Sequence, residues 1–190
     1  MSQSGYKFIK SMRLINLLPQ KIQEGLSHKS LLKVISGLNN FDLQSVNKIS
    51  EAAFLGGADL IDIACKPELV ESAIDFSSLP ICVSSVNPKS FINSVKAGAS
   101  IVEIGNYDSF YEEGINFSEE KVLNLTKETK DILPNVPLSV TVPHNIPTDR
   151  QVDLALKLVF EGADIIQTEG GKSAHPVSYT HLTLPTTPYV

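Results

Sequence analysis

The sequence lacks tryptophan altogether, has two cysteines, and contains only 7% aromatic residues over its length of 190. Two cysteines, Cys65 and Cys82, are too few for the disulfide framework of a small secreted domain, so we predict a reducing compartment. No apolar run approaches the ~20 residues that a membrane-spanning helix needs, which argues against a membrane protein. Residues 1–12 also lack the apolar core of a signal peptide and the Arg-rich pattern of a transit peptide.

Charge is scarce as well, and it is nearly balanced. The chain has 16 Lys and Arg against 21 Asp and Glu, a net charge of −5, and charged residues make up 19% of it. With 42% hydrophobic residues, this composition is typical of globular proteins and argues against intrinsic disorder. Nucleic acid is not expected as a partner, because binding phosphates calls for a basic patch and none is visible.

Both ends of the chain differ from the part between them. Within residues 1–30, an apolar run at helical spacing is interrupted by Pro19 and predicts an N-terminal extension and helix; it consists of Leu14, Leu17, Leu18, Ile22 and Leu26. Residues 177–190 contain no charged residue, four Thr and two Pro. Their first eleven positions resemble a translated adapter oligonucleotide from a sequencing library, so we predict a non-native tail rather than a natural Thr- and Pro-rich one. The natural gene product is then expected to continue beyond residue 176.

A short motif recurs three times in the remaining residues, 31–176. Gly-Ala followed by a polar residue and a β-branched run begins at Gly57, Gly98 and Gly162. Each copy follows a helix-like run, and its glycine supplies the left-handed turn that ends a helix before a buried strand. A second type of strand opens with a proline, at Pro80 and Pro137, where a donor to the sheet is not yet needed.

The helices between these strands carry their own start signals. Asp42 is expected to cap the helix that follows the first strand, and Asn87 the helix that opens with Pro88. Thr148 and Gln151 have the spacing of a capping box, in which the Thr hydroxyl caps the helix and the Gln side chain reaches back.

Counting residues 32–36 as the first strand, the chain has six strands, each followed by a helix except the last. Strict alternation of this kind predicts an α/β fold with a parallel sheet and right-handed crossovers. An open doubly wound sheet and a closed barrel both satisfy it, but the two-unit repeat favours the barrel, whose interior is built from alternating layers. A TIM-type (β/α)8 barrel of the aldolase kind needs ~250 residues, so residues 31–176 are predicted to hold about six of its eight units.

Strand alternation predicts a polar interior for this barrel. The side chains expected to point inward are Lys33, Asp62, Cys82, Ser84, Glu103, Ser139, Thr141, Gln167 and Glu169, whereas Ile61 and Ile63 should face helices. We favour Lys33 inward over Val34, because two inward carboxylates would otherwise lack a cationic partner. Such a set is either a fully paired network without chemistry or an acid/base set that faces a substrate at the C-terminal end of the barrel.

The loops that leave the strands add further candidates at the same end, and among them His144 is the best general acid or base because imidazole titrates near neutrality. We assign catalytic roles to Lys33, Asp62, Glu103 and His144, and substrate-binding roles to Asn39, Asn40, Ser84, Asn106, Thr141, Gln167 and Glu169. No spacing of Cys and His fits a zinc site, so no metal is expected.

Several of these segments together resemble one known family. The hypothetical chloroplast reading frame twenty-three family, found on plastid genomes of algae and in cyanobacteria, has segments similar to residues 33–42 (KVISGLNNFD), 79–84 (LPICVS), 102–111 (VEIGNYDSFY), 139–144 (SVTVPH) and 167–171 (QTEGG). The resemblance implies an aldolase-type barrel of the phosphate- or flavin-binding kind, in the plastid stroma or a cyanobacterial cytoplasm. The family has no established reaction, so it lends no catalytic role to any residue.

Three functions are expected, in descending order. The first is an enzyme, a lyase or an isomerase, that acts on a small phosphorylated or carboxylated metabolite; its partner is then a small anionic molecule. The second is a flavin-dependent oxidoreductase that binds FMN through the loops after the last two strands of a barrel, and the third is a non-catalytic binding or regulatory barrel. Because two strands are expected to be missing, we predict that the chain as it stands is neither active nor stably folded by itself.

Overall fold

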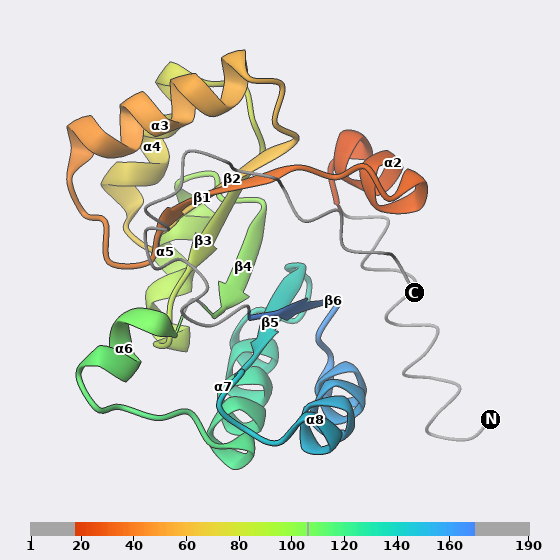
Figure 1. Cartoon of the computed structure of the whole chain (residues 1–190). Helices are drawn as coiled ribbons and strands as arrows, with labels where there is room; N and C mark the ends of the chain where they lie inside the picture. The colour runs from red at the N-terminus through yellow and green to blue at the C-terminus, as the bar shows by residue number, and fades with distance from the viewer. Residues whose placement is uncertain (1–17, 106, 170–190) are drawn as a thin grey trace, which may run out of the picture.

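A computed structural model describes residues 18–105 and 107–169, which form one curled parallel sheet flanked by helices (Figure 1). The six strands follow one another across the sheet in chain order, and every neighbouring pair is parallel. They are β1 (Lys33–Gly37), β2 (Leu60–Ala64), β3 (Ile81–Ser84), β4 (Ile101–Ile104), β5 (Leu138–Val142) and β6 (Ile165–Thr168). The predicted α/β barrel architecture, with six of its units, is therefore confirmed. Asn106, the start of the expected N-terminal run and the expected tail at residues 177–190 lie outside the described residues.

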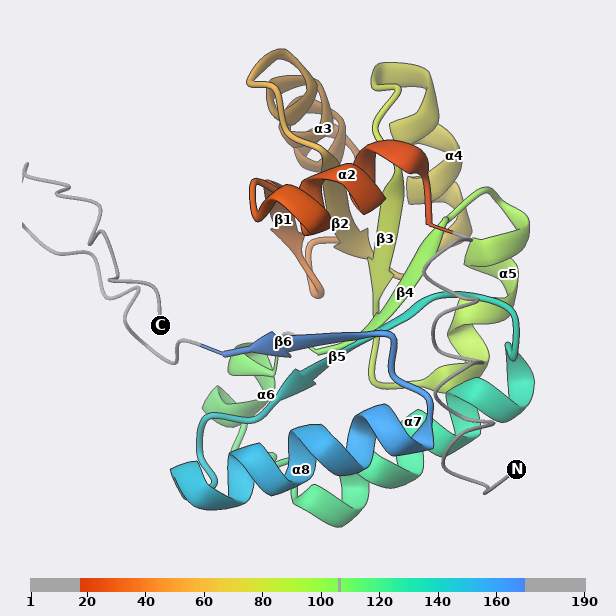
Figure 2. The same cartoon turned by 90° about the vertical axis from the view of Figure 1, so that its right-hand side faces the viewer.

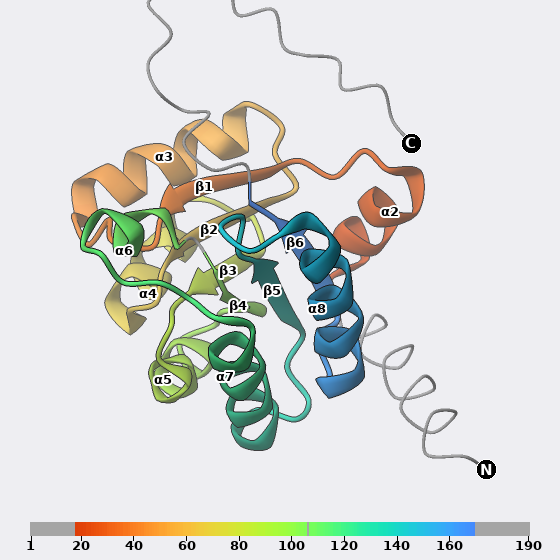
Figure 3. The same ribbon diagram turned by 60° about the horizontal axis from the view of Figure 1, so that its bottom comes forward.

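Helices follow the strands and pack on the outer face of the sheet (Figure 3). They are α3 (Leu43–Leu55), α4 (Pro67–Phe76), the short 3₁₀ helix η1 (Pro88–Ser90) with α5 (Phe91–Lys96), α7 (Glu119–Ile132) and α8 (Thr148–Glu161). The short helix α6 (Asp108–Glu112), in the connection after β4, lies instead near the C-terminal ends of the strands. The main apolar core lies between these helices and the sheet, and in it Ile61 and Ile63 are fully buried, as alternation predicts. No helix in the described ranges is long and apolar enough to cross a membrane.

Helix α2 (Gln20–His28) occupies a different position, against the inner face of the sheet (Figure 2). It begins directly after Pro19, whose ring fixes φ and whose missing N–H is not needed at a helix start. Its buried side chains pack against the first residues of β2 and β4 and the middle of β3, in a small apolar cluster formed by Leu18, Ile22, Leu60, Cys82 and Ile101. Helix α2 therefore covers the N-terminal end of the barrel interior.

Two of the three predicted helix caps are present. The Asp42 carboxylate accepts from the Ser45 backbone N–H at 2.8 Å, and the Asn87 side chain accepts from the Lys89 backbone N–H at 3.2 Å. The capping box at α8 is wrong, because the chain enters that helix through Pro147 and Thr148 is already helical, with no side-chain cap. Gln151 instead donates to the backbone carbonyl of Ile146 at 2.8 Å and holds the loop before the helix.

The Gly-Ala-Asp copies of the repeat form a two-point clasp between neighbouring strands. The Asp164 backbone N–H donates to the Leu138 carbonyl at 2.8 Å, and the Asp164 carboxylate accepts from the Leu138 N–H at 2.9 Å. Asp59 makes the same pair of bonds with Leu32, at 2.9 and 2.8 Å. Glycines Gly57 and Gly162, which precede these aspartates, have φ of +79° and +112°, as the predicted left-handed turns require.

Candidate active site

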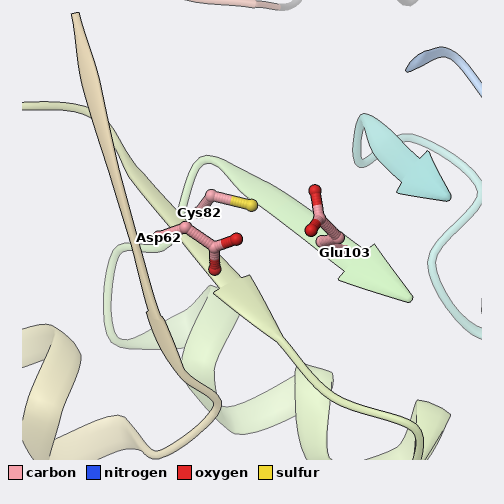
Figure 4. A group of neighbouring side chains, drawn as sticks. All are labelled: Asp62, Cys82 and Glu103. Atoms are coloured by element: carbon pink, nitrogen blue, oxygen red, sulfur yellow. The ribbon is translucent and has the colours of Figure 1, made fainter. Parts of the chain in front are cut away.

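A salt-bridge cluster lies on the inner face of the sheet. The Lys33 ammonium donates to Glu103 Oε2 at 2.7 Å and to Asp62 Oδ2 at 3.2 Å. The Ser84 hydroxyl donates to the other Asp62 oxygen at 2.6 Å. Figure 4 shows Asp62, Cys82 and Glu103 on the adjacent strands β2, β3 and β4, with their side chains directed toward a common space. The predicted inward orientation of these five side chains is confirmed.

Burial controls the protonation of this cluster. The side chains of Asp62 and Glu103 are 1% and 0% exposed, and that of Lys33 is 17% exposed. Burial, followed by repulsion from Glu103, raises the pKa of Asp62 to about 7, although attraction to Lys33 opposes the change. Burial disfavours the charge of Lys33, but attraction to the two carboxylates outweighs it and raises the Lys33 pKa. A proton can therefore bind to or leave Asp62 near neutral pH while Lys33 stays an ammonium ion.

Strands β5 and β6 extend the polar interior toward the C-terminal ends of the strands. The Gln167 amide donates to Glu103 Oε1 at 3.3 Å and lies 3.5 Å from the Thr141 hydroxyl. Gly105 leaves room for the Thr141 and Glu103 side chains. A Cβ at this position would lie 3.1 Å from Glu103 Oε1 and would overlap the Thr141 side chain. The Ser139 hydroxyl is buried and has no hydrogen-bond partner within the described ranges. Thr141 and Gln167 thus contact the cluster, as their predicted inward orientation requires.

A second cluster surrounds His144, in the loop between β5 and α8. His144 Nδ1 lies 2.8 Å from Glu169 Oε2, and this oxygen also accepts from the His144 backbone N–H at 3.1 Å and from the Tyr111 hydroxyl at 3.0 Å. Glu169 Oε1 accepts from the Tyr107 backbone N–H at 3.2 Å. The Tyr111 ring meets the imidazole edge-on, with 5.1 Å between ring centroids. Glu169 comes directly after β6 and two residues after Gln167, which contacts Glu103. The His144 cluster therefore lies on the C-terminal side of the Lys33 cluster.

The contacts of Glu169 differ from the expected arrangement. The sequence predicts substrate binding for Glu169 and groups His144 with the Lys33 set, whereas in the structure the carboxylate of Glu169 holds His144 directly. Tyr107 and Tyr111 are not among the predicted site residues. Tyr111 belongs to α6, whose five residues are too few to show a helical periodicity in the sequence, and Tyr107 directly precedes that helix. The one available signal was their position just after the fourth strand, at the end of a barrel where active sites are found.

The two predicted asparagines that the structure describes, Asn39 and Asn40, have different surroundings. Asn40 donates to the side-chain oxygens of Ser36 and Ser45, at 2.9 and 3.0 Å, and so holds the loop between β1 and α3. Asn39 is exposed in the same loop. The substrate-binding role of both asparagines stays a prediction, as does that of Asn106.

Two sets of side chains in the described part of the chain have the composition of a metal site; they are Asp62, Cys82 and Glu103, and Asp108, His144 and Glu169. In the first set, the Lys33 ammonium already contacts both carboxylates. Burial also raises the pKa of the Cys82 thiol well above its ordinary value, which disfavours the thiolate that metals bind. In the second set, Glu169 already accepts from four donors. Neither arrangement favours a metal over the protein's own contacts.

The curled parallel sheet, with strands in chain order and helices outside it, defines an α/β fold of the TIM-barrel kind. Among solved structures, QR15, an aldolase, is similar with a TM-score of 0.52 and 18% identity, covering 73% of this chain and 65% of that one. Phospho-2-dehydro-3-deoxyheptonate aldolase from Thermotoga maritima is similar with a TM-score of 0.51 and 10% identity, covering 73% of this chain and 40% of that one. At these identities the likeness shows the fold alone.

The sequence itself identifies the family. Residues 17–185 match the family described as Protein of unknown function (DUF561), and the chain belongs to that family. "Uncharacterized protein ycf23" of Cyanophora paradoxa is 50% identical over 153 residues, which are 79% of this chain and 62% of that protein. The protein of the same name from Porphyra purpurea is 39% identical over 165 residues, 87% of this chain and 62% of that protein. The family resemblance drawn from the sequence motifs is therefore confirmed.

The relatives also bear on location and extent. They are plastid-encoded proteins of algae, which agrees with the expected plastid or cyanobacterial setting. The chain spans 62% of the length of the Cyanophora relative and 56% of the Antithamnion relative. The matched residues 17–185 include part of the expected non-native tail, whose origin stays a prediction.

Proposed function

We propose that the full-length protein is an acid/base enzyme, a lyase or an isomerase, that acts on a small phosphorylated or carboxylated metabolite. By full-length protein we mean a protein of the curated relatives' length that contains this chain. The observation that carries the proposal is the buried cluster of Lys33, Asp62 and Glu103, in which the pKa of Asp62 is raised to about 7. A carboxylic acid that takes up and releases its proton near neutral pH is suited to general acid/base catalysis.

The charge of the cluster indicates which part of a substrate would enter it. When Asp62 is protonated, Lys33 and Glu103 balance each other and the interior carries no net charge; when it is ionised, the cluster is negative. An uncharged carbonyl or hydroxyl group therefore suits this space better than a phosphate or carboxylate does. The anionic group of the metabolite would remain at the C-terminal mouth, near the loops and His144.

The same geometry favours proton transfer over imine formation. An amine attacks a carbonyl only as the neutral base, and a lysine used in this way has a lowered pKa. Lys33 has the opposite environment, because two carboxylates within 3.2 Å stabilise its ammonium form. We therefore assign to Lys33 the roles of holding both carboxylates and polarising a bound oxygen, to Asp62 and Glu103 proton transfer in the interior, and to His144 proton transfer at the mouth.

Solvent-deuterium exchange tests the proposal without requiring that the product be known. The full-length protein is incubated in D2O with a panel of small phosphorylated or carboxylated ketones, aldehydes and hydroxy acids, and loss of carbon-bound hydrogen is followed by proton NMR. We expect exchange on at least one compound, reduced about 100-fold or more by Asp62→Asn or His144→Gln. Lys127→Met, which alters an exposed residue on the outer helix α7, is the matched control and should leave the rate unchanged.

Two outcomes would overturn the proposal. Exchange that persists in the Asp62→Asn and His144→Gln variants would place the chemistry elsewhere. Absence of exchange on the whole panel, combined with flavin absorbance in the purified protein, would favour the FMN-linked oxidoreductase; without flavin absorbance, it would favour the non-catalytic binding barrel. Borohydride reduction in the presence of a reactive carbonyl compound should leave Lys33 unmodified, and a reduced adduct on Lys33 would contradict its assigned role.

A further inference from the structure

We propose that Glu169 is a positioning residue that fixes His144 in the tautomer with hydrogen on Nδ1, so that Nε2 is the atom that accepts the substrate proton; the catalytic part of this rests on the function proposed above. A carboxylate can only accept hydrogen bonds. With Glu169 Oε2 at 2.8 Å, His144 Nδ1 must therefore carry the hydrogen. In a neutral imidazole, the lone pair then lies on Nε2, which is free to act as a base.

The imidazole is held at more than one point. The backbone N–H and the Nδ1 atom of His144 bind the same oxygen of Glu169, at 3.1 and 2.8 Å, so one carboxylate fixes both the loop and the ring. The Tyr111 and imidazole rings pack against each other in a T-shaped arrangement, with 85° between their planes. Rotation of the ring would therefore break the bond to Glu169 and disturb this packing at the same time.

The carboxylate of Glu169 is itself held. Its side chain is 7% exposed, and its two oxygens accept from four donors in all, on His144, Tyr107 and Tyr111. The His144 side chain is 34% exposed, so the imidazole can be reached from outside while its partner cannot. This is the geometry expected when a buried acid orients a base that must meet a substrate.

Two further titratable side chains near the imidazole, among the described residues, belong to α6. Asp108 lies in the first turn of that helix, with a carboxylate oxygen within 4.8 Å of ligand atoms of both His144 and Glu169, and the Tyr111 hydroxyl donates to Glu169.

NMR of the full-length protein labelled with ¹⁵N-histidine tests the assignment directly. Correlations between ring nitrogens and ring protons report which nitrogen carries hydrogen, and loss of signals in His144→Gln identifies this residue among the histidines. We expect the wild type to show the Nδ1–H tautomer at high pH. Glu169→Gln should mix the two tautomers, because an amide can donate a hydrogen bond to Nδ1 as well as accept one from it.

Tyr111→Phe is the matched control. It removes one hydrogen bond to the same Glu169 oxygen but keeps the carboxylate and the aromatic ring, so the tautomer should stay that of the wild type. If Glu169→Gln fails to fold, the test rests on the tautomer of His144 in the wild type and in Glu169→Asp, which keeps a carboxylate but shortens the side chain. An Nε2–H tautomer in the wild type, or an unchanged tautomer in a folded Glu169→Gln, would overturn the proposal. The NMR result does not depend on deuterium exchange, so failure of the proposed function can be told apart from failure of the positioning role.

Discussion

Lys33 of β1 and Glu103 of β4 form a 2.7 Å ion pair, although strands β2 and β3 lie between them in the sheet. In a flat sheet, three strand spacings of ~4.8 Å would separate the backbones of these strands by ~14 Å. A lysine can reach a glutamate across two intervening strands because the sheet curls around its inner face. The pair therefore links the curvature of the barrel to the chemistry of its interior.

Substitution of Lys33 by methionine should destabilise the full-length protein strongly. It keeps the length of the side chain but leaves Asp62 and Glu103 buried without their cation, for which we expect a loss of about 3–5 kcal/mol in the free energy of unfolding. Lys127→Met removes an exposed partner of Glu161 at 3.8 Å and should cost less than about 1 kcal/mol. Urea unfolding measures both, and equal effects would contradict the importance of the buried cluster.

Substitution of Asp62 by asparagine should change how stability depends on pH. The folded state raises the Asp62 pKa from 3.8 to about 7, so folding favours the protonated acid. The resulting stabilisation is complete below pH 3.8 and is lost as pH rises through about 7. We expect wild-type stability to fall relative to Asp62→Asn over this interval, by up to a few kcal/mol. Unfolding curves at several pH values measure this, and parallel pH profiles for the two proteins would be the contrary result.

The two aspartate clasps should differ in strength. Asp164 is 1% exposed and also binds the Lys130 ammonium at 2.9 Å, whereas Asp59 is 17% exposed and binds Lys21, whose side chain is 54% exposed. Asp164→Ala leaves a largely buried ammonium without its anion and should cost about 3–5 kcal/mol. Asp59→Ala should cost about 1 kcal/mol. Thermal or urea unfolding of the two variants measures this difference in stability. A larger loss of stability for Asp59→Ala would show that the buried charge does not set the difference.

Exposed apolar side chains on helices α3 and α8 predict that the 190-residue chain is poorly stable by itself. Leu55 at the end of α3 is 77% exposed, and on α8 the apolar stripe of Val152 and Leu156 is 60% and 67% exposed. Strands β1 and β6 each pair on one side only among the described strands. We expect the 190-residue chain to unfold over a broad temperature range and to bind a hydrophobic dye, whereas the full-length protein unfolds sharply. A sharp cooperative transition of the chain alone would contradict this.

The fold and the Lys33 cluster could be predicted because both follow from periodicity. Alternation along each strand assigns Asp62 and Glu103 to one face, and the need for a cation selects Lys33 over Val34. Gly57 and Gly162 mark the helix ends because few other residues adopt a positive φ without cost. These features depend on local geometry, which a sequence encodes directly.

The His144 cluster could not be assembled in the same way. Glu169 and Tyr111 meet His144 from segments 25 and more residues away, and their contacts depend on loop conformations that carry no repeating pattern. The capping box failed for a related reason. Thr148 and Gln151 have the right spacing, but Pro147 sets the backbone entering α8, and the Gln151 amide binds the preceding loop.

Helix α2 and the residues just before it close the N-terminal end of the barrel interior. Leu18 and Ile22 form an apolar layer with Leu60 and Ile101 below the Lys33 cluster. Water and ions do not readily cross such a layer, so it shields the Lys33 cluster from solvent at the N-terminal end of the interior. Of the two ends of the interior, the one beside His144 therefore offers the polar approach to Asp62.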